Sequence, residues 1–144
     1  YKRSRVREWL EKQSETAASD ASFVYTGVLT AYRGTTGAGD FTQTRLDGLE
    51  SYLLPYQDCR DRLFLLSLEE AYRYREKIWN LKGMGSSYSR GFWLRTPAYE
   101  LDESGNFVYG NREYVADLEK GCFRQADVSD TGIGICPAFC LPQA

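Results

Sequence analysis

The sequence contains no histidine, and that absence removes several kinds of chemistry. Ser-His-Asp and Cys-His catalysis, imidazole metal ligation and histidine pH switching are all excluded. No apolar run reaches the length of about 18 residues that a membrane-spanning helix needs. The 18 basic and 20 acidic residues leave a net charge of −2, whereas a protein that neutralises nucleic-acid phosphates is usually far more basic. We therefore expect no nucleic acid among its partners and no membrane span.

The chain is long enough to form one hydrophobic core, and it contains many aromatic side chains. A length of 144 residues predicts a single domain, 1–144, because it is too short to build two cores. Eleven tyrosines provide half of the aromatic residues and carry polar hydroxyl groups. The chain starts at Tyr1 without an apolar signal segment, so we expect a fragment or a processed product.

The four cysteines leave three alternatives open, namely free thiols, disulfides and a four-cysteine zinc site. No C-x2-C pair is present, since Cys136 and Cys140 are separated by three residues. If both lie in one strand, their Cα atoms are about 13 Å apart. A disulfide requires a separation under about 7 Å, so these two are not expected to bond to each other.

The first half of the chain predicts a helix followed by strands and loops. Ser4 is a candidate N-cap, and Val6, Trp9 and Leu10 share one face of a helix over 5–13, which Trp9 is expected to anchor. Further along we predict a loop over 14–22, a strand over 23–32 with a bulge at Gly27, a long loop over 33–48 and a buried strand over 61–66.

The second half predicts one more helix and then short strands. Ser67 and Glu70 form a capping-box pattern, so a helix is expected to begin at residue 68 and to end at Gly83. A flexible loop over 83–90 follows, and the predicted strands cover 91–96, stopped by Pro97, then 107–109, 113–116 and 133–141, with turns at 103–106, 110–111 and 129–132. Helices followed by short antiparallel strands indicate an α+β domain.

Four segments, in order, resemble motifs of a bacterial domain family of unknown function, itself similar to the C-type-lectin-like fold. They are Ser4–Leu10 (SRVREWL), Asp61–Ala71 (DRLFLLSLEEA), Gly91–Pro97 (GFWLRTP) and Gly132–Leu141 (GIGICPAFCL). The resemblance implies two helices packed on a small twisted antiparallel sheet. It also implies that the strand pair that precedes the first helix in the family is missing here. Cys136 stands where the family has arginine, and Cys140 where it has tryptophan.

The candidate binding residues are polar and aromatic side chains in the turn-rich stretch before the last strand. In binders of this fold the ligand face comes from the C-terminal region, and such side chains make adaptable contact surfaces. The predicted ligand-binding residues are Tyr99, Tyr109, Asn111, Arg112, Tyr114, Phe123 and Arg124. The resemblance makes three other residues framework positions: Trp9, Trp93 and Arg95. Strand alternation places Trp93 and Arg95 on the face opposite Phe92 and Leu94.

No metal and no cofactor are expected. The acidic residues Glu100, Asp102, Glu103, Asp127 and Asp130 occur in turns, without the Glu-Pro-Asn or Trp-Asn-Asp motifs of calcium-dependent sugar-binding lectins. We expect a non-catalytic recognition module that binds a protein or a glycan, outside the cell, on a cell surface or on a virion. One alternative is a cysteine-dependent oxidase related to formylglycine-generating enzymes. Another is an assembly module completed by a strand from a partner chain.

Overall fold

The chain is an α+β protein, as predicted. The computed structural model describes residue 1 and residues 4–33, 41–42, 49–55, 57–82 and 91–143. The helices are α1 (Arg5–Ala17), α2 (Leu68–Arg73) and α3 (Arg75–Trp79). The strands are β1 (Val24–Tyr25), β2 (Thr30–Arg33), β3 (Phe41–Thr42), β4 (Glu50–Leu53), β5 (Arg60–Asp61), β6 (Phe92–Leu101), β7 (Phe107–Asp117) and β8 (Cys122–Asp127). No helix among the described residues is both long and apolar enough to cross a membrane.

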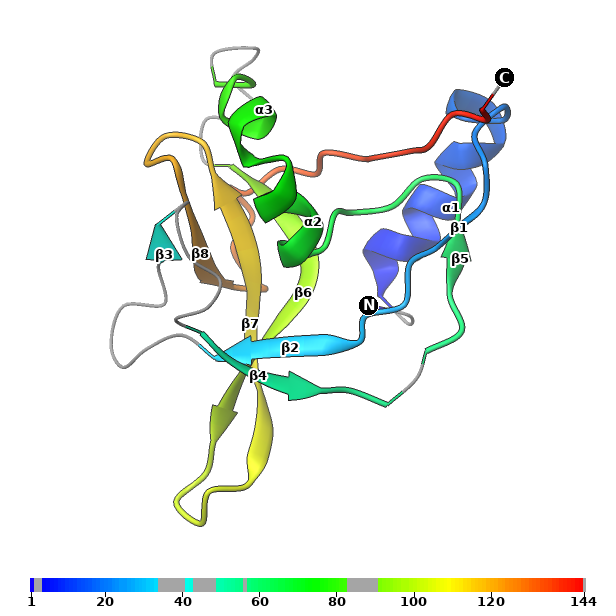
Figure 1. Ribbon diagram of the computed structural model, residues 1–144. Coiled ribbons are helices and arrows are strands. Elements are labelled where there is room, and N and C mark those ends of the chain that lie inside the picture. The colour runs from blue at the N-terminus through cyan, green and yellow to red at the C-terminus, as the bar shows by residue number, and fades with distance from the viewer. Residues whose placement is uncertain (2–3, 34–40, 43–48, 56, 83–90, 144) are drawn as a thin grey trace.

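The main sheet has six strands in the order β3-β8-β7-β6-β2-β4. All neighbours are antiparallel except β2 and β6, which meet in parallel where Tyr32 faces Ala98. The sheet is therefore mixed, not wholly antiparallel as expected. In Figure 1, α2 lies in front of β6, and the β6–β7 hairpin extends beyond β2 and β4. An ion pair between Arg7 and Asp61 joins α1 to β5.

Helix α1 begins where the sequence predicts but ends later. The Ser4 side chain accepts a hydrogen bond from the Arg7 backbone N–H, as an N-cap does. The helix then continues to Ala17, so the prediction of a loop from residue 14 is wrong. Ser14 remains helical because its hydroxyl donates to the Glu11 carbonyl, 2.6 Å away, which satisfies the buried side chain within the helix.

Trp9 does not anchor α1, contrary to the prediction. Its side chain is 47% exposed, whereas the next residue, Leu10, is fully buried in a cluster with Leu63 and Leu65. The helix buries only a narrow stripe of side chains, and Leu10 takes the central position in it. The anchor of α1 is therefore Leu10.

The predicted strand over 23–32 is two strands that belong to different sheets. β1 pairs with β5 in a two-stranded sheet, and β2 joins the six-stranded sheet. Gly27 lies at the break, where a Cβ would collide with the Gln57 carbonyl oxygen. The close approach of two backbones, which glycine permits, redirects the chain at this point.

Pro97 does not stop its strand, and the predicted turn at 110–111 does not form. Between the pairs Pro97–Glu113 and Tyr99–Tyr109, one residue of β6 faces three residues of β7. This bulge accommodates the proline, which has no N–H to give to a ladder. It also contains Gly110 and Asn111, so β7 passes through the expected turn as one strand.

Other strand predictions differ because several buried segments are extended without forming ladders. The strand expected over 61–66 has ladder pairing only at its start, in β5. The strand expected over 133–141 makes isolated bridges to three separate segments, Phe92–Gly134, Phe64–Ala138 and Ser22–Cys140. Strands β3, β4 and β8 were not predicted, and β3 falls within the loop expected over 33–48. The loop predicted over 33–48 lies mostly outside the described residues, and that over 83–90 lies wholly outside them.

The start of the second helix is confirmed, including its capping box. The Ser67 hydroxyl accepts from the Glu70 N–H at 3.1 Å, and the Glu70 carboxylate accepts from the Ser67 N–H at 2.9 Å. The helix does not run unbroken toward residue 83. It is interrupted at Tyr74, which has φ −102° and ψ 16°, and resumes as α3.

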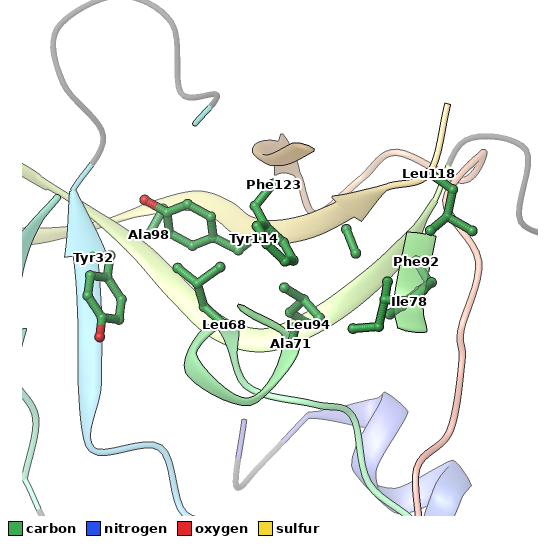
Figure 2. Close-up of a cluster of buried hydrophobic side chains, with 11 residues drawn as sticks. Tyr32, Leu68, Ala71, Ile78, Phe92, Leu94, Ala98, Tyr114, Leu118 and Phe123 are labelled. Carbon is green, nitrogen blue, oxygen red and sulfur yellow. The ribbon is translucent and has the colours of Figure 1, made fainter. Parts of the chain in front are cut away.

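The main hydrophobic core lies between these helices and the sheet (Figure 2). Leu68 and Ala71 of α2 are fully buried beside Leu94 of β6. The same cluster contains Tyr32, Ile78, Phe92, Ala98, Tyr114, Ala116, Leu118 and Phe123. Two residues predicted to bind ligand, Tyr114 and Phe123, are therefore core residues.

Candidate functional site

The structure separates the predicted ligand-binding residues into buried and exposed groups. Tyr99 is 4% exposed, and Tyr114 and Phe123 are not exposed at all, so these three cannot contact a ligand in this conformation. The Tyr114 hydroxyl accepts from the Gln125 amide at 3.1 Å, inside the protein. Burial of their rings in the core, rather than presentation in loops, corrects the prediction for all three. The side chain of Tyr109 lies outside what the structure describes.

Arg124 is half-buried and has a structural partner. Its Nε donates to the Asp117 carboxylate at 2.7 Å, which joins β8 to the end of β7. Burial alone would raise the pKa of Asp117, but hydrogen bonds from the Lys120 N–H and Arg124 hold it below its usual value. Asp117 is thus a charged partner that stabilises the turn before β8.

Arg95, predicted as a framework residue, is held by a buried ion pair. It is 5% exposed and makes two bonds to the Glu70 carboxylate, at 2.6 and 2.7 Å. It also donates to the Leu65 carbonyl at 2.5 Å. Burial alone would raise the pKa of Glu70, but Arg95 and the Ser67 N–H hold it below its usual value. This network joins two of the segments that carry the family resemblance.

Two predicted ligand-binding residues, Asn111 and Arg112, are exposed and line a cavity. The bulge in β7 places them at its rim, where one residue of β6 faces three of β7. The cavity has a volume of about 240 Å³. Its other lining residues are Tyr1, Val28, Leu54, Gln57, Pro97, Gly110, Glu113 and Val128.

A larger cavity, of about 390 Å³, shares a wall with the first. Tyr1, Glu113 and Val128 line both of them. The lining residues of the larger one are completed by Ser4, Arg5, Val6, Leu65 and Trp93. We call the two adjoining cavities, with the residues that line them, the Glu113 site. An apolar pocket with a few polar groups is the usual form of a small-ligand site.

Among the described residues, Glu113 is the one carboxylate that lines either cavity. No hydrogen bond or side-chain ion pair joins it to another described residue. Burial raises the pKa of its carboxyl group, and the positive amino group of Tyr1 opposes that shift. A half-buried carboxylate without a direct partner is costly, and such groups occur often at functional sites.

Trp93 and Tyr1 provide aromatic walls beside this carboxyl group. Trp93 is half-buried and packs on two hydrophobic clusters, one with Leu10 and Leu65, the other with Val115. This packing holds the indole in place. Burial raises the pKa of Tyr1 to about 12, so its phenol stays protonated and neutral at pH 7.

The lining residues are suited to binding. Hydrolysis of a glycosidic bond uses two carboxyl groups across the scissile bond, and here Glu113 is alone. The Ser4 hydroxyl is engaged as the cap of α1. The site therefore offers one carboxylate, two exposed arginines (Arg5 and Arg112), aromatic surface and apolar walls, which can recognise a ligand without a chemical step.

No disulfide joins the four cysteines, all of which are among the described residues. Cys59 and Cys122 are buried, Cys136 is half-buried and Cys140 is exposed. Neither Cys136 nor Cys140 lines the Glu113 site. Among the described residues, no three cysteine or acidic side chains gather as metal ligands would.

Three of the five acidic residues weighed as calcium ligands bond within turns, whereas Glu100 lies in strand β6 and not in a turn. The Asp102 carboxylate accepts the N–H groups of Ser104 and Asn106, at 2.9 and 2.8 Å. Asp127 and Asp130 accept N–H groups from residues two positions later in the same way. Local bonds of this kind are typical of Asx turns.

Sequence reasoning missed Glu113 as a site residue, although it predicted the strand that contains it. The available signal was a carboxylate directly before the apolar run Tyr114–Ala116, in a strand with one buried face. Alternation places Glu113 opposite Tyr114, but only the structure shows that Tyr1 and α1 cover that face.

No protein-family model, curated protein or solved structure matches this chain. The geometry of the Glu113 site, and the motifs described above, are therefore the basis for the functional argument.

Proposed function

We propose that this protein is a non-catalytic recognition module of the C-type-lectin-like type, which binds a protein or glycan ligand at the Glu113 site. The observation that carries the proposal is the half-buried carboxyl group of Glu113, which lines both cavities and forms no side-chain ion pair with a described residue. Such a group lowers stability unless something else offsets its burial, and a bound ligand would do so.

The fold assignment within this proposal is supported by contacts between the motif segments. Arg95, from the GFWLRTP segment, binds Glu70, from the DRLFLLSLEEA segment. The last motif segment runs back to the N-terminal part of the chain, where the Ser22 N–H donates to the Cys140 carbonyl at 2.9 Å. Within an α+β scaffold, this contact brings residue 140 next to the segment that follows α1, although a fold does not determine a ligand.

The proposal is tested by probing glycan and peptide arrays with the labelled protein. Val128 is 55% exposed and lines both cavities, so Val128→Arg should obstruct the site without disturbing the core. Glu113→Gln removes the charge and keeps the shape. The control is Glu8→Gln, on the exposed face of α1.

We expect the unaltered protein and Glu8→Gln to bind the same array members. Val128→Arg should abolish that binding, and Glu113→Gln should weaken it on the order of tenfold, as for loss of a partly buried charged contact. If nothing binds on either array, or if all four proteins bind equally, the proposal is refuted.

One observation favours a second candidate, an assembly module that accepts a strand from another chain. Strand β4 is at one edge of the six-stranded sheet, all four of its residues are exposed, and Leu53 is 80% exposed. Exposed edge strands can pair with another chain. Light scattering of the unaltered protein and of Leu53→Lys tests this function. A dimer that dissociates in the variant would support it, and a monomer in both would refute it.

A further inference from the structure

The Glu113 site combines a negative group with apolar and aromatic walls. We infer that it accepts an ammonium group carried on an apolar stem, the chemistry of a lysine side chain on a protein ligand. This inference rests on the proposed function and names the ligand class for that site. The larger cavity, of about 390 Å³, would take the stem against Val6, Leu65 and Val128. The ammonium group would then lie at Glu113.

The carboxyl group selects for a cation over other ligands. A carboxylate only accepts hydrogen bonds, and an ammonium group has three N–H donors and the opposite charge. An alcohol offers one donor and no charge, and an anion would be repelled. In a partly desolvated pocket these differences exceed those at an open surface, because water screens the charges less.

Trp93 also favours a positively charged ligand. Cations are attracted to the face of an indole ring, and the attraction is stronger where water is partly excluded. Trp93 and Glu113 line the same cavity, so one cation can be near both groups. Leu65 and Val6 beside them favour a ligand whose stem is apolar, which describes an alkylammonium better than a sugar ring covered in hydroxyl groups.

Other positive groups near the site do not reverse this preference. Arg5 from α1 and Arg112 from β7 line the two cavities but are exposed, so water and salt screen them. The positive amino group of Tyr1 lowers the pKa of the Glu113 carboxyl group and so opposes the effect of burial.

The experiment titrates the full chain, labelled with ¹⁵N, with three probes that share a four-carbon stem or acyl chain. They are n-butylammonium chloride, n-butanol and sodium butyrate at pH 7 and constant ionic strength. The reporters are the backbone amides of Glu113 and Val128 and the indole N–H of Trp93, which is assigned with Trp93→Phe. Glu113→Gln is the test variant, and Glu8→Gln is the control.

We expect n-butylammonium to shift all three reporters, with an apparent affinity on the order of tenfold higher in the unaltered protein than in Glu113→Gln. The alcohol should bind weakly and equally to both, and butyrate should not bind. If the alcohol and the ammonium bind equally well, the ligand class is wrong but the cavity is a binding site. If no probe shifts these signals, both this inference and the proposed site are wrong.

Discussion

The ion pair between Arg95 and Glu70 provides the sharpest test of how this fold is stabilised. We consider Arg95→Met, which keeps an apolar stem of similar length and removes the guanidinium group. The change deletes two bonds to Glu70 and one to the Leu65 carbonyl. It also removes the guanidinium carbon that lies 5.7 Å from the centre of the Phe64 ring.

The loss of stability in Arg95→Met follows from the Glu70 carboxylate, which remains without its partner. Removing one partner of a buried ion pair costs about 3–5 kcal/mol, because the other charge remains without compensation. Since the Glu70 side chain is 32% exposed and can regain some water, we expect about 3 kcal/mol, the lower end. For 144 residues the entropy of unfolding is about 0.3 kcal/mol/K, so the melting temperature should fall by about 10 °C.

The matched control is Arg33→Met, at an ion pair on the surface. Arg33 and Glu50 are 3.1 Å apart, with side chains 32% and 67% exposed. Exposed pairs contribute at most about 1 kcal/mol, so this change should lower the melting temperature by at most about 3 °C. Urea unfolding followed by circular dichroism gives the free energy for each variant. Equal losses in the two variants would refute the reasoning.

The remaining predictions concern Glu113, Gly91 and Ser67. The folded-state pKa of Glu113 is raised, so its contribution to stability is greatest below its ordinary pKa of 4.5 and is lost as the pH rises. Glu113→Gln should therefore raise the melting temperature at pH 7 but not at pH 4. A change in melting temperature that is the same at both pH values would contradict this. Gly91 has φ +89°, and a Cβ there would collide with the Ala116 carbonyl. Gly91→Ala should lower the free energy of unfolding by well over the ~1–2 kcal/mol expected for Gly105→Ala, because Gly105 has φ +78° but no atom near the position of a Cβ. Equal urea midpoints for the two variants would contradict this. Ser67→Ala should cost about 1 kcal/mol by loss of the α2 cap, against no change for Ser104→Ala in an exposed turn.

Features fixed by neighbouring residues could be predicted from the sequence. The Ser4 cap and the capping box of Ser67 and Glu70 depend on side chains three residues from the groups they bind. The turn at 103–106 depends on Asp102 in the same way. These interactions are local, so the sequence contains almost all of the information that determines them.

Features fixed by contacts between distant segments could not be predicted. Tyr114 and Tyr99 are of a residue type that is common in binding loops, but β-sheet pairing directs both side chains into the core. The bulge opposite Pro97 depends on how β6 and β7 align, and no local pattern gives that alignment. Glu113 belongs to a site only because α1 and Tyr1, far away in the sequence, cover the same part of β7.

Arg95 and Glu113 show how one pair of strands can serve both stability and recognition. Both are charged residues of paired strands, β6 and β7, and both are at least half-buried. Arg95 has its partner within the fold, since Glu70 neutralises its charge. Glu113 forms no side-chain ion pair with a described residue, although a glutamine there would avoid the cost of burying a charge. Stability alone explains why a buried charge occurs at Arg95, but not why one occurs at Glu113. A cationic ligand would explain the charge at Glu113, because it would form with β7 the kind of ion pair that Arg95 of β6 already forms within the fold.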